Sequence, residues 1–140
     1  GKYTVSDRVL RAVQAEFSCG FCTDAQGAQT IGRTFRENHY LLDTHTAVAC
    51  TVLDAYRAGT GDQTLTVVES TASPFKFCAS VLDALGVTEH APGTGVLGQL
   101  TAETGRPAPG PLASLAGKPV RFDQVTDRGD MRAVVTEFLR

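Results

Sequence analysis

The sequence predicts an α/β domain in which helices pack around a small, mainly parallel sheet. Most of the chain carries apolar residues three or four positions apart, the spacing of amphipathic helices. Two short apolar runs, residues 65–69 and 120–125, are instead typical of strands. The first run is nearly continuous, as in parallel sheets that are covered on both faces. Helices alternating with strands indicate an α/β architecture.

The first half of the chain predicts three helices. The first covers residues 6–17, with Ser6 as its N-cap. The second begins at a capping-box pattern, Thr23 to Gln26, and runs to about residue 39. The third covers residues 46–58 and stops at the glycine-rich stretch 59–62. Gly20 separates the first two, which we therefore expect to form a helical pair.

The second half predicts a strand at 65–69, a helix from about residue 74 that Gly86 ends, a strand at 120–125 and a last amphipathic helix at 131–139. Between them, residues 92–119 hold five of the six prolines and six glycines, so we expect mostly loop there, with one short helix near 95–104. Two strands make a poor sheet for 140 residues. Either further strands lie in the loops, or the chain is part of something larger.

Composition is that of an ordinary soluble domain, with 42% apolar residues, 20% charged residues and a net charge of −2. The 13 lysines and arginines are scattered, which argues against a nucleic-acid or membrane surface. The sequence contains neither an apolar run long enough to cross a membrane nor a signal-peptide pattern. We therefore predict a cytoplasmic protein of one domain, residues 1–140.

The four cysteines include one CxxC pair, Cys19 and Cys22. Such a pair is compatible with redox activity or with half of a zinc site. Zinc needs a second pair of ligands, and the sequence has no other CxxC and only three histidines, none at HxxxH spacing. We expect four reduced, mostly half-buried thiols and no metal.

Three small residues follow the first predicted strand, in the stretch VVESTASPFKF at 67–77. Ser73 and Pro74 are typical of a helix start, with serine as the N-cap and proline at the first helical position. Ser70, Thr71 and Ala72 are therefore expected at a strand end that faces a helix N-terminus, where open α/β sheets bind ligands. Small side chains let a flat ligand approach, and hydroxyls both donate and accept hydrogen bonds. The alternative is a capped turn without a ligand.

A second candidate is the stretch from Asp43 to Thr46, before the third helix. His45 beside hydroxyl groups at a helix N-terminus is suited to a phosphate or carboxylate. Alternatively, Asp43 or Thr44 caps the helix and His45 has only a local role.

The stretches LLDTHTAVA (41–49) and VVESTASPFKF (67–77), in this order and at this separation, resemble threonine synthase of the bacterial and fungal subgroup. That subgroup typically has DPHTAVG followed by STAHPAKF or STASPYKF. The opening GKYTVSDRVL (1–10) and the closing KPVRFDQVTDRGDMRAVVTEFL (118–139) are similar to the family as well. Thr44 replaces the usual proline, and Ala49 a common glycine.

The resemblance implies a tryptophan-synthase-like fold (fold type II) that binds pyridoxal 5'-phosphate (PLP). Threonine synthase converts O-phosphohomoserine and water into threonine and phosphate. Full-length members are considerably longer than this chain, which is similar to their carboxyl-terminal part. The resemblance therefore implies that the remainder of a threonine synthase chain is the partner of these residues, and that they are inactive alone.

The resemblance also implies roles for individual residues. Thr71 matches the threonine that hydrogen-bonds the pyridine nitrogen of PLP, and Ser70 and Ala72 shape the same wall. His45 and Thr46 fall on a loop expected near the substrate phosphate. The Schiff-base lysine lies in the family's earlier portion, so no catalytic residue is expected here; Lys76 is not at its position.

Two other classes of function stay open on the sequence alone. One is a non-catalytic module of the same fold that binds a small anion through residues 43–46 and 70–73. The other is a redox or metal protein built on Cys19 and Cys22.

Overall fold

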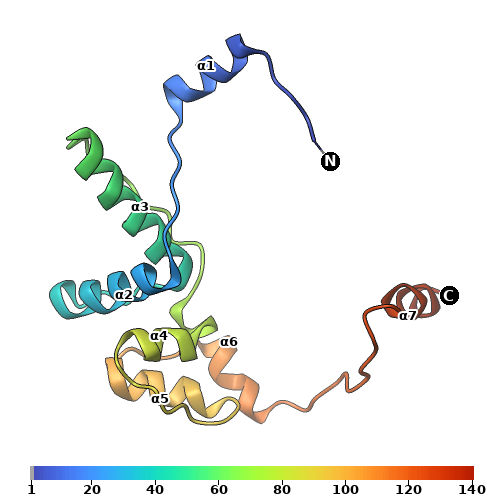
Figure 1. Cartoon of the computed structure of the whole chain (residues 1–140). Coiled ribbons are helices and arrows are strands. Elements are labelled where there is room, and N and C mark those ends of the chain that lie inside the picture. The colour runs from blue at the N-terminus through green and yellow to red at the C-terminus, as the bar shows by residue number, and fades with distance from the viewer. Residues whose placement is uncertain (1) are drawn as a thin grey trace.

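The computed structural model describes residues 2–140, so Gly1, which begins the GKYTVSDRVL match, lies outside the described residues. Figure 1 shows one body of packed helices from which the two ends of the chain extend. None of the helices in the described part is long and apolar enough to cross a bilayer. The elements are, in order, α1 (Asp7–Glu16), α2 (Asp24–Asn38), α3 (Thr44–Thr60), the 3-10 helix η1 (Pro74–Lys76), α4 (Cys78–Ala84), α5 (Gly95–Thr104), α6 (Gly110–Ala113), the 3-10 helix η2 (Ser114–Gly117) and α7 (Met131–Phe138).

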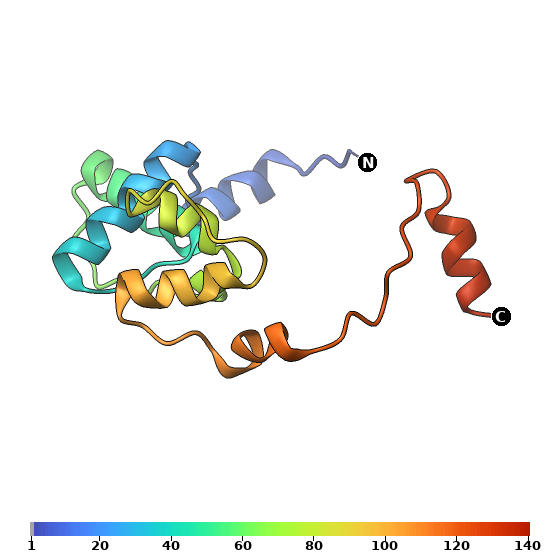
Figure 2. The same ribbon diagram turned by 90° about the horizontal axis from the view of Figure 1, so that it is seen from below.

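The predicted sheet is wrong, because residues 2–140 contain no strand. Residues 65–69 and 120–125 are stretched-out connections, and Figures 1 and 2 show them well apart, the first at α3 and the second in the C-terminal arm. A strand needs a neighbour for its backbone N–H and C=O groups. Without one, Leu65 and Phe122 are 92% and 78% exposed. The described fold is all-helical, not helices around a tryptophan-synthase-like sheet.

The helix starts that were predicted from capping residues are confirmed. Ser6 accepts a hydrogen bond from the backbone N–H of Val9 at the start of α1. Thr23 and Gln26 form the expected reciprocal capping box of α2. Ser73 caps η1, with Pro74 at its first position, and η1 leads directly into α4. Local hydrogen bonds of this kind depend on neighbouring residues alone, which is why the sequence reveals them.

The helix pair α2 and α3 forms the first half of the body. The buried Thr30 hydroxyl lies 2.7 Å from that of Thr51. Thr51 donates its own proton to the Ala47 carbonyl, so Thr30 is the donor between the two helices. Arg33 and Asp54 add an ion pair across the same helices, but both side chains are about half exposed, so it contributes little.

The hydrophobic core lies where α2, α3, α4 and α5 meet. Its buried members come from every one of these helices and from the short connections between them: Ile31, Leu42, Ala47, Phe75, Cys78, Val81, Leu82 and Leu100. Helix α5 packs on the far side of α4 and returns the chain toward α2, where Arg106 donates a hydrogen bond to the His39 carbonyl at 2.7 Å. This core fixes the N-terminus of α3 relative to η1 and α4.

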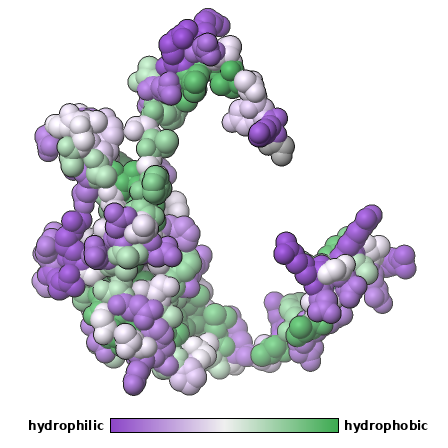
Figure 3. All heavy atoms as spheres, in the orientation of Figure 1, coloured by the Kyte–Doolittle hydropathy of each residue, from purple (hydrophilic) through white to green (hydrophobic). Residues whose placement is uncertain are grey.

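Helices α1 and α7 lie outside the body. Each has an apolar face that no other described residue covers; Phe17 after α1 is 73% exposed and Phe138 on α7 is 83% exposed. Figure 2 confirms from a second direction that α7 stands away at the end of an arm. In Figure 3 hydrophobic surface is visible along both ends of the chain. Helix α1 buries no residue, so the helical pair that the sequence predicted for α1 and α2 is wrong.

Residues 64–70 run back along α3 and are attached near both of its ends. Arg57, near the C-terminal end of α3, donates hydrogen bonds to the Thr64 carbonyl and the Thr66 hydroxyl. Ser70 meets the N-terminal end, as described below. The segment is therefore attached to α3 on both sides of residues 67–69.

Gly32 is the close-approach point between α2 and α4. A Cβ atom at this position would lie 2.6 Å from the backbone oxygen of Ala84. We expect Gly32→Ala to force the helices apart and to lower the free energy of unfolding by about 1–3 kcal/mol. Gly27→Ala is the matched control, because its Cβ meets nothing within 4 Å; the better helix propensity of alanine should stabilise it by up to about 1 kcal/mol. Urea unfolding of both variants measures the difference, and an equal effect would contradict the close approach.

Candidate functional site

The carboxylate of Asp43 organises the start of α3. Asp43 is 1% exposed, and its Oδ1 accepts hydrogen bonds from the backbone N–H groups of His45 at 2.8 Å and Thr46 at 3.2 Å. Two of the otherwise unpaired N–H groups of the first helical turn are thereby satisfied. The sequence prediction that Asp43 caps this helix is confirmed.

The same carboxylate also connects the two candidate motifs. Its Oδ2 accepts hydrogen bonds from the Thr46 hydroxyl and, at 3.4 Å, from the Ser70 hydroxyl. The Thr46 and Ser70 oxygen atoms are themselves 3.0 Å apart. Residues 43–46 and Ser70 thus form one hydrogen-bonded cluster. The sequence identified Thr46 and Ser70 as candidates but gave no sign that they touch.

Hydrogen bonding keeps Asp43 ionised despite its burial. Burial by itself would raise the pKa of the carboxyl group. The hydrogen bonds from the side chain and backbone of Thr46, from the His45 N–H and from Ser70 act in the opposite direction and leave the pKa below its ordinary value of 3.8. The cluster therefore holds a buried negative charge with several donors around it.

His45 lies at the outer side of this cluster. Its side chain is 69% exposed, and its Nδ1 is 3.6 Å from Asp43 Oδ1 and 3.4 Å from the Thr44 hydroxyl. The imidazole ring is 5.1 Å from the ring of Phe77, tilted by 51°. His45 therefore joins the start of α3 to the end of η1 while leaving much of its ring accessible.

Thr71 and Ala72 follow directly after the cluster. Thr71 is exposed, and its hydroxyl makes no hydrogen bond to any residue in the range 2–140. Ala72 is half-buried, and Ser73 accepts a hydrogen bond from the Phe75 N–H at 3.3 Å. The three residues 70–72 are therefore held on both sides, by the Asp43 cluster and by the η1 cap, and Thr71 presents an available hydroxyl.

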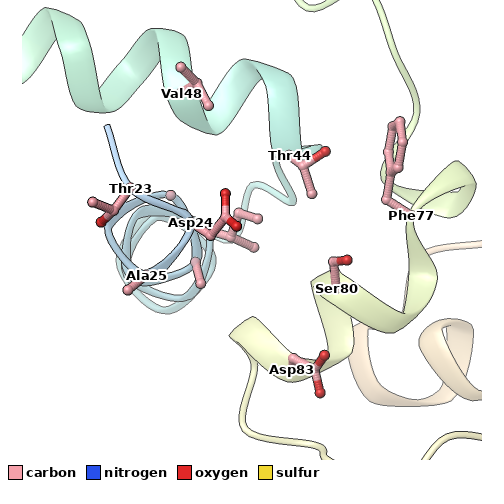
Figure 4. Close-up of a pocket in the computed structure, with 11 residues that line it drawn as sticks. Thr23, Asp24, Ala25, Thr44, Val48, Phe77, Ser80 and Asp83 are labelled. Carbon is pink, nitrogen blue, oxygen red and sulfur yellow. The ribbon is translucent and has the colours of Figure 1, made fainter. Parts of the chain in front are cut away.

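A cavity of about 550 Å³ lies between α2, the start of α3 and α4. Figure 4 shows Thr44 and Phe77 at one end of it and Asp83 on α4. Its wall on α2 includes the small residues Ala25, Gly27 and Ala28, beside Asp24 and Ile31. The sequence prediction missed this cavity, although small residues on one face of a helix were its available signal. Thr71 does not line it, so it is a neighbouring space and not the 70–72 loop itself.

The cysteines take no part in this cluster. Cys19 is exposed and Cys22 half-buried, whereas burial raises the thiol pKa of both Cys50 and Cys78. A raised pKa keeps these two thiols protonated and unreactive near neutral pH. Within residues 2–140, no group of three or more His, Cys, Asp or Glu side chains is arranged to hold a metal ion.

Comparison with known proteins assigns the chain to one family. Residues 46–136 match the family described as "Threonine synthase, C-terminal". The match covers well over half of the chain and includes Thr46, Ser70 and Thr71. The chain belongs to this family, and the resemblance to threonine synthase that was noted in the sequence is confirmed.

The curated relatives that this chain matches are named threonine synthase or threonine synthase-like 1. "Threonine synthase-like 1" of Mus musculus is 33% identical over 82 residues, which is 58% of this chain and 10% of the relative. The Homo sapiens protein of that name is 30% identical over 62% of this chain and 11% of its own length. "Threonine synthase" of Saccharomyces cerevisiae is 28% identical over 61% of this chain and 18% of its own length. The chain thus spans less than a fifth of the length of these relatives.

The depressed pKa of Asp43 predicts how stability changes with pH. Because the unfolded chain binds this proton more readily than the folded chain, the contribution of Asp43 is complete above the unfolded value of 3.8 and is lost as the pH falls through the folded pKa. We expect the melting temperature of Asp43→Asn to lie below that of the parent at neutral pH and to converge with it in acid. Thr46→Val retains the Asp43 carboxylate but removes one of its main hydrogen-bond donors, so it should reduce the slope of melting temperature against pH in acid. Parallel slopes for the parent and Asp43→Asn would contradict this role.

Proposed function

We propose that this chain is the C-terminal part of a PLP-dependent threonine synthase, a lyase that converts O-phosphohomoserine and water into threonine and phosphate in the cytoplasm. Membership of the threonine synthase C-terminal family supports the proposal. The single observation that carries it furthest is the cluster of Asp43, Thr46 and Ser70, which joins the two motifs at the position where Thr71 offers its hydroxyl.

The residues at 70–72 are suited to the flat ring of the cofactor. Ser70 and Ala72 are small, and the Thr71 hydroxyl is exposed and has no partner among residues 2–140. PLP, when bound, supplies an electron sink for carbanions of the substrate. In the proposal, Thr71 holds the pyridine nitrogen through one hydrogen bond. Since a hydroxyl is not an anion, it leaves this nitrogen largely neutral, whereas a carboxylate would hold it protonated.

His45 and Thr46 would act on the substrate side. The His45 side chain is accessible, and its ring can donate a hydrogen bond to an anion, whereas the backbone N–H groups of His45 and Thr46 are already bonded to Asp43. Its imidazole is thus placed to contact the phosphate of O-phosphohomoserine. Thr46 is 4% exposed and its hydroxyl is bonded to Asp43, so in this proposal Thr46 acts by keeping the loop in place.

The remainder of a threonine synthase chain is the proposed partner of these residues. The relatives are several times longer than this chain, and α1, the 65–69 segment and the C-terminal arm all expose apolar side chains. The lysines of this chain are Lys2, Lys76 and Lys118, and none matches the family's cofactor-linked lysine. We therefore expect the 140 residues alone to form no threonine.

Replacement of Thr71 tests the cofactor contact. In the complete protein that carries this chain, Thr71→Val retains the shape and removes the hydrogen bond. The loss should cost about 1–3 kcal/mol, which is on the order of tenfold to a hundredfold in PLP affinity or turnover. Thr71→Ser retains the hydroxyl and should lose much less. Both quantities are measured by PLP titration and by phosphate release.

A capped turn without a ligand predicts a different result for Thr71→Val. If Thr71 only completes a capped turn, the valine variant should melt at a slightly lower temperature and keep the parent's PLP affinity and turnover. Such an outcome would remove Thr71 from the site.

Hydrogen exchange tests the proposed partner surface. In the isolated chain we expect the amides of α1 and α7 to exchange much faster than those of α2 and α4, because neither α1 nor α7 has a buried residue. Embedding the same residues in the complete protein should slow exchange in α1 and α7 by orders of magnitude and change α2 little. Unchanged exchange in both end helices would rule out the partner surface.

A further inference from the structure

The Asp43 side chain has a second role besides capping α3: it holds Ser70. A carboxylate that only capped α3 would need the two backbone N–H groups of His45 and Thr46, which its Oδ1 accepts. The other oxygen, Oδ2, points toward the next motif and accepts hydrogen bonds from Thr46 and Ser70. The whole side chain is buried, with 1% of the residue exposed. Asp43 is therefore built into a contact between segments that are 27 residues apart.

The contact places the residue that follows Ser70. Consecutive Cα atoms are held about 3.8 Å apart by the planar peptide bond, so fixing Ser70 confines Thr71 to a small volume. Toward the N-terminus, the segment is held by the hydrogen bonds from Arg57 to Thr64 and Thr66. Toward the C-terminus, Ser73 is held by its cap on η1. Without the contacts of Ser70 with Asp43 and with Thr46, which Asp43 itself holds in place, residues 67–72 would be attached at their two ends only.

We propose that Asp43 is a positioning residue that holds the 70–72 loop, and with it the Thr71 hydroxyl, in a single conformation. The inference rests on the proposed function for its purpose, but the positioning itself is a property of the chain without any cofactor. Asp43 touches neither cofactor nor substrate in this proposal; it acts through Ser70.

The test is the backbone order parameter of the loop, measured by ¹⁵N relaxation on the chain without PLP. In the parent we expect a value of about 0.85 at Thr71, typical of rigid backbone, and below about 0.6 once the contact is removed. Asp43→Ser is the informative variant, because serine is as good an N-cap as aspartate but its side chain is too short to reach Ser70. Ser70→Ala removes the contacts of Ser70 with both Asp43 and Thr46 and leaves the cap of α3 unchanged.

Two control variants separate positioning from general loosening. Thr23→Ala removes the N-cap of α2 but has no contact with the loop, so the order parameter at Thr71 should stay near that of the parent. Glu69 precedes Ser70 and is exposed, and the Glu69 side chain makes no hydrogen bond within residues 2–140. Glu69→Ala should therefore also leave the order parameter at Thr71 unchanged. If Asp43→Ser fails to fold, Ser70→Ala is compared with Thr46→Val, which removes the Thr46 contact but keeps the Asp43 carboxylate and should leave the loop ordered. An unchanged order parameter at Thr71 in Ser70→Ala would overturn the proposal.

PLP affinity of the complete protein then distinguishes this inference from the proposed function. If Thr71→Val weakens PLP binding, Asp43→Ser should weaken it about tenfold, and the Asp43→Ser, Thr71→Val double variant should be hardly worse than Thr71→Val, because both changes act through one hydroxyl. Loss of loop order together with no effect of Thr71→Val would leave the positioning intact and sink the proposed function. A PLP effect of Thr71→Val with an ordered loop in Asp43→Ser would sink the positioning instead.

Discussion

The buried carboxylate of Asp43 is the constraint on which the arrangement of both motifs depends. An ionised group removed from water is tolerated only when several donors replace the lost hydration. Asp43 obtains these donors from the first turn of α3 and from Ser70. Any conformation that withdrew them would leave a bare charge inside the protein. The requirement of one side chain thus sets the distance between the start of one helix and the loop before the next.

Much of the helical framework follows from local patterns. The start of α2 is visible in the capping box of Thr23 and Gln26, and residues 95–104 form the short helix that was predicted inside the proline-rich region. Of the predicted site, His45, Thr46 and Ser70 do come together. What the sequence does not show is that Asp43 serves two segments at once. A capping pattern depends on neighbours in the chain, whereas the contact with Ser70 depends on how α3 and residues 64–70 lie in space.

The incorrect sheet has the same physical origin. Residues 65–69 and 120–125 have the composition of strands, and composition reports that a segment tends to be buried, not what buries it. A strand exists only with a hydrogen-bonded neighbour, and residues 2–140 offer none at either segment. The exposed fractions of 86% for Val67 and 93% for Val125 show the apolar side chains still facing outward. Both segments are apolar, but residues 2–140 contain no neighbouring strand that could pair with either of them.

The hydrogen bond from Arg106 to the His39 carbonyl has a kinetic consequence. It joins residues 67 positions apart, whereas the α2 and α3 contacts join residues about 21 apart. Contacts between distant residues require a larger loop to close before they are gained, and they slow folding. The α2–α3 hairpin is therefore expected to assemble early, and the attachment of Arg106 to the end of α2 to be a late event. Helix α5 packs on α4, its near neighbour in sequence, so only the segment after α5 waits for this closure.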